Sequence, residues 1–309
     1  MTLTIIPPDQ GPKYWLVGDQ INFKVTGERT DGAFAMAENY ITPQHGPPPH
    51  VHHREHECYY VLSGQFFFAS GATAFVVGAG AAVFLPKDVP HVFKNVGPTP
   101  GKFLLMAVPA GFETMVMEAG QAIDCIPFDK TVSPNDIQKL LAVCPRHNLE
   151  LKLDWNPAAP AEPPTHDRKL WVLGQHVTIK LTSAESNGAL SLAEVASQPG
   201  EGVPSHSHRA VDEVFYILES NWEFIINGQT TPAPPGTTIH IPRGVMHSFK
   251  NVGLTRGRLV DYHLPGGFEQ FFEDAGVEAA DDNIPPKLPP PDMPSLIALF
   301  DKHGMDVPA

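Results

Sequence analysis

The sequence predicts an all-β protein made of two similar sandwich or small-barrel domains in tandem, each ending in short helices. Three observations support this: the second half of the chain repeats the first, short apolar runs alternate with turn residues, and turn-forming residues are abundant. The 309 residues include 33 prolines and 26 glycines, which favour turns and short strands over long helices. This length also suits two domains of ordinary size.

A single register relates the two halves of the chain. Trp15 corresponds to Trp171 and His147 to His303, in both cases at an offset of 156 residues. The same offset holds without a gap from residue 14 to about residue 303, which chance does not produce. We therefore infer an internal duplication.

A stretch rich in proline and alanine separates the halves. It covers residues 152–168 and is the expected linker. We predict an N-terminal domain at residues 1–151 and a C-terminal domain at residues 152–309. The counterpart of the linker in the second half is expected over residues 281–294.

The predicted elements follow in chain order from apolar runs and turn signals. The first-half strands are expected at residues 50–52, 58–62, 65–68, 74–77 and 82–85. Asn227-Gly228 is a strong signal for a two-residue hairpin in the second half. Apolar residues at helical spacing predict helices at residues 111–120 and 267–276, and further short helices at 135–143 and 294–300.

Charge and composition exclude several classes of function. The net charge of −13 argues against a nucleic-acid or anionic-membrane partner. The N-terminal residues MTLTIIPPDQ lack the features of a signal peptide, and no apolar stretch approaches the roughly 18 residues of a membrane span, so a cytoplasmic location is expected. None of Cys58, Cys125 and Cys144 forms a CxxC pair, which predicts free thiols.

The arrangement of the histidines indicates a metal site in each half. His50 and His52 are two residues apart, and on a strand this spacing places both imidazoles on one face. Glu57 follows shortly afterwards, and His91 comes much later, on what should be a neighbouring strand. At the offset of 156 residues the second half repeats the whole set: His206, His208, Glu213 and His247.

A ligand set of three imidazoles and one carboxylate suits Fe, Mn, Ni, Co, Cu or Zn better than Ca or Mg. With one set in each half, the chain is expected to bind up to two ions. Such a set leaves coordination positions open for substrate, water or dioxygen. A lone HxH pair is more often a surface pair, but here the full set occurs twice in register. His45, His53 and His56 have no histidine counterpart and are expected at the surface or rim. Glu55 is not repeated either, so Glu57 is the preferred ligand.

These residues lie in segments that resemble the two motifs of the cupin superfamily, G-x5-HxH-x4-E-x6-G and G-x5-PxG-x2-H-x3-N. The first half has HVHHREHECYYVLSG and GAAVFLPKDVPHVFKN, and the second has SHSHRAVDEVFYILES and GTTIHIPRGVMHSFKN. The resemblance implies a bicupin, with two jelly-roll-like β-barrels that each hold a metal ion. Gln44, Asp88 and Ser220 stand at turn positions where the motifs have glycine, and none of them is a ligand.

Two further segments are similar to quercetin 2,3-dioxygenase-like cupins: GPPPHVHHRE at residues 46–55 and the PGGFE-type segment at 109–113 and 265–269. Oxalate decarboxylases carry an arginine three residues before the first histidine, where this chain has Pro47 and Val203. The resemblance therefore implies a metal-dependent dioxygenase that cleaves a flavonol-like or other enolisable aromatic substrate with release of carbon monoxide. Glu57 or Glu213 would take the enolic proton as the catalytic base.

Strand alternation also predicts the residues around the metal. Tyr59, Phe93, Phe215 and Phe249 should point inward and form an aromatic substrate pocket, although such residues also fill barrel cores without any ligand. We expect the first half, which alone carries GPPPHVHHRE, to be the main catalytic centre. The alternatives are a metal-dependent lyase or isomerase and a non-catalytic ligand-binding or storage bicupin. The partners expected are a small-molecule substrate and dioxygen, and a homo-oligomer is compatible with the sequence.

Overall fold

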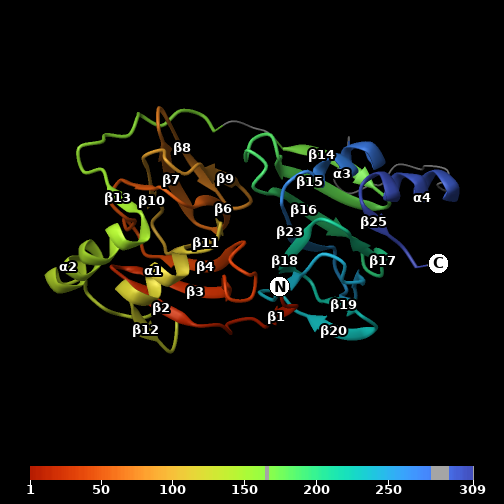
Figure 1. Cartoon of the computed structure of the whole chain (residues 1–309), viewed down its shortest axis with the longest axis horizontal. Coiled ribbons are helices and arrows are strands. Elements are labelled where there is room, and N and C mark those ends of the chain that lie inside the picture. The colour runs from red at the N-terminus through yellow and green to blue at the C-terminus, as the bar shows by residue number, and fades with distance from the viewer. Residues whose placement is uncertain (164–166, 280–291, 309) are drawn as a thin grey trace. The chain divides into compact units, whose positions relative to one another are not determined.

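The computed structural model describes residues 1–163, 167–279 and 292–308. The described chain consists mainly of antiparallel strands and divides into two compact units, one of residues 10–165 and one of residues 1–9 with 166–309 (Figure 1). Each unit contains two sheets and two short α-helices, so the prediction of two tandem β-barrels is confirmed.

The unit of residues 10–165 has a seven-stranded and a five-stranded sheet. Across the larger sheet the order is β12 (Gln121–Ile123), β2 (Lys13–Leu16), β3 (Asp19–Val25), β4 (Ala35–Ile41), β11 (Gly101–Val108), β6 (His56–Ser63) and β9 (Ala82–Leu85). Across the smaller sheet it is β13 (Leu149–Leu151), β5 (His50–His52), β10 (His91–Asn95), β7 (Gln65–Ser70) and β8 (Thr73–Gly78). The helices are α1 (Phe112–Ala119), α2 (Pro134–Val143) and the 3-10 helix η1 (Cys144–His147).

The second unit has an eight-stranded and a five-stranded sheet. The larger sheet runs β1 (Thr4–Ile6), β21 (Thr238–Ile241), β18 (Asp212–Glu219), β23 (Gly257–Leu264), β16 (Ser191–Ser197), β15 (Gln175–Leu181), β14 (Arg168–Val172) and β24 (Val277–Glu278). The smaller sheet runs β20 (Gln229–Ala233), β19 (Trp222–Ile226), β22 (His247–Asn251), β17 (Gly202–His208) and β25 (Met305–Asp306). The helices are α3 (Glu269–Ala275) and α4 (Met293–Lys302), so all four predicted helices are present.

Strand β1 makes the two units differ. It pairs antiparallel with β21, with Thr4 opposite His240, and in Figure 1 the red strand lies among the cyan strands of the second-half unit. In the first unit the equivalent of β21 is β9, which is the last strand of its sheet among the described residues. The predicted domain limits, 1–151 and 152–309, stay a prediction, and the compact units differ from them at the chain start and in the linker. Most of the predicted segment 281–294 lies outside the described residues, as does part of the linker.

Period-two alternation builds the core of each barrel. Phe66 and Phe68 of β7 are fully buried while Gln65 is exposed, and Trp222 and Phe224 of β19 are buried in the same way. Burial of one such side chain contributes about 1.5–3 kcal/mol to the free energy of unfolding. The strands that carry these aromatic residues pair with β10 and β22, which supply the third histidine of each metal set. The core therefore fixes the positions of those histidines.

Turn chemistry agrees with the sequence in detail. Asn227 and Gly228 connect β19 and β20 with φ of 49° and 79°, as a type I′ hairpin requires. Gln44, Asp88 and Ser220, which replace motif glycines, adopt φ of 64°, 64° and 66°. Their counterparts in the other half are Gly200, Gly244 and Gly64, with φ of 83°, 78° and 90°. The duplicated fold thus keeps the left-handed turn whichever residue occupies it.

The left-handed conformation should cost stability where the residue is not glycine. Gln44→Gly is expected to raise the free energy of unfolding by about 1 kcal/mol, because a Cβ is disfavoured at positive φ. Asp88 and Ser220 make side-chain hydrogen bonds, whereas Gln44 is exposed, so Gln44 tests the backbone effect most directly. Chemical denaturation measures the change. Gly200→Ala is the matched control and should destabilise, because Gly200 has φ of 83°. A Cβ there meets no atom within 4 Å of the described structure, so a steric clash does not contribute. A loss of stability in Gln44→Gly would contradict the prediction.

Candidate metal centres

The first candidate centre joins the two sheets of its unit. His50 and His52 come from β5 and His91 from β10, with His91 paired opposite His50, while Glu57 comes from β6 in the other sheet. All four side chains are buried, and the atoms they offer as ligands lie within 4.8 Å of one another. The strand spacing therefore brings the four residues to one point inside the barrel.

The second candidate centre repeats this arrangement. His206 and His208 come from β17, Glu213 from β18 and His247 from β22, with His206 paired opposite His247. These side chains are also buried, and their ligand atoms also lie within 4.8 Å of one another. All eight residues proposed from the sequence are therefore assembled into two clusters.

Backbone carbonyl groups orient four of the six histidines. In each case Nδ1 lies 2.9 Å from the carbonyl oxygen two residues earlier: Pro48 for His50, Val89 for His91, Pro204 for His206 and Val245 for His247. Donation from Nδ1–H to a carbonyl oxygen leaves Nε2 as the free lone pair, which is the usual outer-shell arrangement of a metal-binding histidine. Nε2 of His91 and of His247 lies beside the ligand carboxylate of its cluster, so the local backbone prepares these rings for coordination.

Electrostatics also favour a metal ion. Burial, together with the neighbouring imidazoles, lowers the pKa of His50 and of His206 to about 3, so both rings are neutral and able to coordinate at neutral pH. Burial alone would raise the pKa of Glu57, but the charges of His52 and His91 outweigh it and hold the pKa well below the ordinary range. The first centre thus presents an ionised carboxylate and, at His50, a neutral imidazole.

Several buried atoms of the clusters lack a hydrogen bond. Nε2 of His91, His208 and His247 has no hydrogen-bond partner of acceptable geometry among the described residues, and neither has Oε2 of Glu213. An unsatisfied buried polar group costs about 1–3 kcal/mol. A transition-metal ion would satisfy these atoms together, so the residues present fit the implied metal. Each half therefore contains a candidate site for a divalent transition metal.

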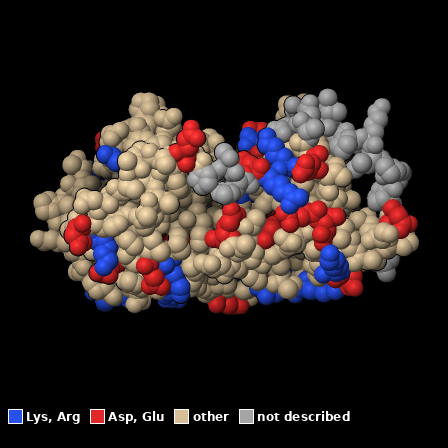
Figure 2. Space-filling model, turned by 90° about the horizontal axis from the view of Figure 1, so that it is seen from above, with Lys and Arg blue, Asp and Glu red and all other residues tan. Residues whose placement is uncertain are grey.

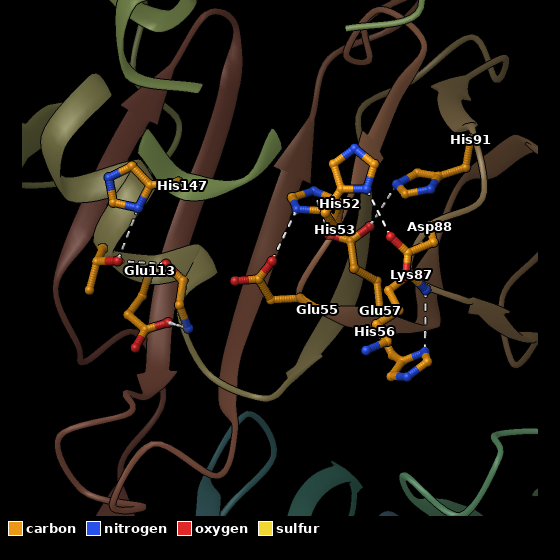
Figure 3. Close-up of polar contacts among 12 residues, drawn as sticks. His52, His53, Glu55, His56, Glu57, Lys87, Asp88, His91, Glu113 and His147 are labelled. Atoms are coloured by element: carbon orange, nitrogen blue, oxygen red, sulfur yellow. Dashed lines mark hydrogen bonds and ion pairs between the residues drawn. The ribbon is translucent and has the colours of Figure 1, made fainter. Parts of the chain in front are cut away.

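Glu55 has a role that the sequence comparison did not identify. It is buried, and its Oε2 lies 3.5 Å from Nδ1 of His52, on the side of the ring away from the cluster (Figure 3). The second half has Val211 at this position, and Nδ1 of His208 has no hydrogen-bond partner among the described residues. A carboxylate thus lies at ion-pair distance from the outer nitrogen of a ligand histidine in the first centre alone. The spacing of three residues between His52 and Glu55 is the sequence signal for this contact. Comparison of the two halves does not reveal it, because Glu55 is not repeated.

The two ligand carboxylates also have different neighbours. In the first centre, the Tyr59 hydroxyl donates a 2.8 Å hydrogen bond to Oε2 of Glu57. In the second, Nε2 of His263 lies 3.4 Å from Oε1 of Glu213 and 3.4 Å from Oδ2 of Asp261, and all three residues are buried. The first half has Leu105 and Ala107 at the positions of Asp261 and His263. The halves therefore share their ligands but differ in the groups that hold the carboxylate.

A cavity adjoins each centre. The first has about 570 Å³ of empty space including its mouth, and Tyr59 and Phe93 line it as expected from the sequence. The second has about 680 Å³, and Phe249 lines it. Phe215 does not belong to this lining, because it lies deeper on β18 and packs in the core against Phe224 and Phe249. Neither cavity has a lysine or arginine among the described residues that line it.

Asp19 is a second carboxyl group of the first cavity besides Glu57. Burial raises its pKa from the ordinary 3.8 to about 7. Between these two values the unfolded chain has lost this proton while the folded protein retains it, so the contribution of Asp19 to stability falls as the pH rises from about 4 to about 7. Asp19→Asn removes this dependence. We expect the Tm of metal-free Asp19→Asn, relative to the unsubstituted protein, to be higher at pH 8 than at pH 4. If the Tm difference between Asp19→Asn and the unsubstituted protein is the same at pH 8 and pH 4, the raised pKa of Asp19 is contradicted.

The surface shows charges of both signs. On the face in Figure 2, the basic side chains of the described residues lie close to acidic ones, without a large area of positive charge. No helix within the described ranges combines the length and apolar character needed to cross a membrane. All three cysteines are free.

Comparison with known proteins gives matches in both halves. The family model described as "Cupin domain" matches residues 40–107 and 193–263. A quercetin 2,3-dioxygenase of Bacillus subtilis is 28% identical over 99 residues, which are 31% of this chain and 29% of the relative. The polyketide synthase CurC of Streptomyces cyaneus is 32% identical over 84 residues, 27% of this chain and 53% of the relative. The HTH-type transcriptional regulator PuuR of Escherichia coli is 30% identical over 154 residues, 48% of this chain and 81% of the relative.

Solved structures resemble the chain over most of its length. The oxalate decarboxylase of Lactobacillus farciminis, in complex with formate, aligns with a TM-score of 0.61 and 16% identity, covering 88% of this chain and 90% of that one. A deletion mutant of Bacillus subtilis oxalate decarboxylase aligns with a TM-score of 0.59 and 15% identity, covering 86% and 78%. Identities this low show the fold alone. Among the curated relatives, the chain spans 53% of CurC and 29% of the quercetin 2,3-dioxygenase.

Proposed function

Because the chain belongs to the cupin superfamily, as a bicupin with a candidate metal site in each half, we propose that it is a metal-dependent dioxygenase of flavonols or other enolisable aromatic compounds. The relatives include a quercetin 2,3-dioxygenase and oxalate decarboxylases, which supports a metal-dependent cupin enzyme as the broader class. The choice within this class depends on the cavities.

The observation that carries the proposal is the lining of the cavities. Aromatic side chains line both of them, and neither is lined by a described lysine or arginine. A small dianion such as oxalate is normally bound with the help of a cationic side chain, and arginine is the residue best suited to a carboxylate. A flat aromatic ring gains instead from burial against Tyr59, Phe93 and Phe112 in the first cavity. The lining therefore favours an aromatic substrate.

In this proposal Glu57 takes the proton of the substrate's enolic hydroxyl group in the metal-loaded centre, where the histidines would be neutral ligands and their charges would no longer lower the Glu57 pKa. The Tyr59 hydroxyl holds the Glu57 carboxylate by its 2.8 Å hydrogen bond to Oε2, which also lies 3.2 Å from Nε2 of His91, while Oε1 lies 3.6 Å from Nε2 of His52. A bound transition metal would supply a Lewis acid for the deprotonated substrate oxygen. The aromatic lining excludes water and orients the ring. Both atoms of dioxygen enter the product and one substrate carbon leaves as carbon monoxide, so no external reductant is required.

Oxygen consumption tests the proposal. The protein is loaded separately with Mn, Fe, Co, Ni, Cu and Zn, and each form is incubated with quercetin in an oxygen electrode while carbon monoxide is collected. We expect at least one metal form to consume one dioxygen for each carbon monoxide released. Conversion of the substrate without oxygen would assign the protein to the lyases or isomerases instead. No oxygen uptake with any metal form and a panel of flavonols would rule out quercetinase activity.

A further inference from the structure

We propose that the side chains of Asp19 and Asn39 form a polar subsite in the wall of the first cavity, which binds ring hydroxyl groups of an aromatic substrate. The identity of the ligand rests on the proposed function, but the subsite itself rests on independent observations. None of the metal chemistry described above uses either residue.

Both residues belong to the cavity by their place in the sheet. Asp19 is the first residue of β3, and Asn39 lies on the adjacent strand β4, where it pairs with Ile21. Asp19, Ile21 and Asn39 all line the cavity that also contains His50 and Glu57. Because side chains two residues apart share one face of a strand, Asp19 and Ile21 point to the same side as Asn39. The two polar groups are thus neighbours in one wall.

The protein leaves Asn39 unsatisfied, and it gives the Asp19 carboxyl group no charge that favours ionisation. Asn39 is only 2% exposed, yet its Oδ1 has no hydrogen-bond partner among the described residues. Burial raises the pKa of Asp19 to about 7, and no described cation offsets this. Most buried polar atoms in folded proteins have a partner, so an unpaired one calls for an explanation. A ligand in the cavity would provide it.

The second half shows that the fold does not require these residues. Gln175 stands at the position of Asp19, and its amide oxygen accepts a hydrogen bond from the Ser197 hydroxyl. Val195 stands at the position of Asn39 and packs in the hydrophobic core. The same two strands are therefore built with a satisfied and an apolar side chain in the other copy. The polar pair of the first half is better explained by binding than by folding.

The chemistry of the pair defines the ligand class. Oδ1 of Asn39 accepts a hydrogen bond, and the Asp19 carboxyl group can donate or accept one near neutral pH. Phenolic hydroxyl groups match both, while the aromatic lining matches the ring that carries them. The first cavity should therefore prefer a polyhydroxylated aromatic compound over one whose rings carry no hydroxyl groups.

Ligand binding to Asn39→Val in the metal-loaded full chain, without oxygen, tests the subsite. The probes are quercetin and 3-hydroxyflavone, which share the enolic group but differ in their ring hydroxyl groups. We expect the substitution to weaken quercetin binding about tenfold and 3-hydroxyflavone binding less than about twofold, as the loss of one buried hydrogen bond implies. Asn22→Val is the matched control: its Oδ1 is also buried and unpaired within the described structure, but Asn22 does not line the cavity. This control should leave both affinities unchanged.

Two further measurements separate this inference from the proposed function. Metal-free Asn39→Val should have a Tm about 2–4 °C higher than the unsubstituted protein, because an unpaired buried group is removed. Resorcinol, which has ring hydroxyl groups but no flavonol enol, is a third probe. If resorcinol binds, Asn39→Val weakens that binding, and neither flavonol binds, then the flavonol proposal is wrong and the subsite is supported. Three results would each overturn the subsite. The substitution could weaken the binding of all probes equally, it could lower the Tm, or it could leave resorcinol binding unchanged.

Discussion

Glu57→Gln is expected to lower the turnover number at least about 100-fold, while Glu213→Gln should retain most of the activity. Glutamine keeps the shape of the side chain and an oxygen ligand but cannot accept the enolic proton, and a positioned general base contributes about 10²–10⁴ in rate. The first centre is favoured because Glu57 is held by the Tyr59 hydroxyl and faces a cavity with a polar subsite. Steady-state oxygen uptake with quercetin measures both variants.

Metal content serves as the control in this experiment. Both variants must bind as much metal as the unsubstituted protein, so that a loss of turnover reports the missing base and not a missing ion. Retained activity in Glu57→Gln together with its loss in Glu213→Gln would place catalysis in the second half. Equal losses would show that both centres contribute.

His91→Ala and His247→Ala should each remove one metal ion per chain, and the double variant should bind none. Each substitution takes away one of four ligands and leaves a buried carboxylate without full compensation, which is strongly unfavourable. Metal analysis after dialysis measures the content. Removal of metal from the unsubstituted protein should also lower its Tm, because an ion present at 100 times its Kd stabilises the fold by about 2.7 kcal/mol.

His53→Ala is the matched control for the ligand variants. His53 follows His52 directly, but its side chain is 45% exposed and contacts Asp88 outside the cluster (Figure 3). It also contacts Glu150. It should keep the full metal content. An unsubstituted protein that takes up none of the added metals would contradict the prediction, and so would a single variant that loses both ions.

The eight cluster residues could be found from the sequence because two strong rules converge on them. Strand alternation places His50 and His52 on one face, and the repeat shows which carboxylate is kept, which separates Glu57 from Glu55. The same comparison concealed whatever is not repeated. It excludes Glu55 as a ligand and gives no reason to select Asp261 or His263, because each of the three has an apolar counterpart in the other half.

Other features depend on packing that no local pattern encodes. Phe215 points inward as predicted, but depth along the barrel decides whether an inward residue meets the cavity or the core, and Phe215 lies in the core. Asn39 lies within a predicted barrel, yet only the folded structure shows that its side chain is buried without a partner. Strand β1 is three residues long, and its partner β21 lies more than 200 residues away in the chain, so no local signal could predict the pairing.

The position of β1 has a consequence for how the chain is made. During synthesis Thr4–Ile6 leaves the ribosome before the first barrel, whereas β21 is added only after that whole barrel. Thr4–Ile6 therefore stays unpaired while residues 10–165, which form a compact unit of their own, can already fold. Closing this long loop is a late step, and until then the edge of β21 offers unpaired backbone groups to other chains. Strand β1 thus completes the second barrel from a position before the first one, and deletion of Thr4–Ile6 should lead to aggregation through the C-terminal half.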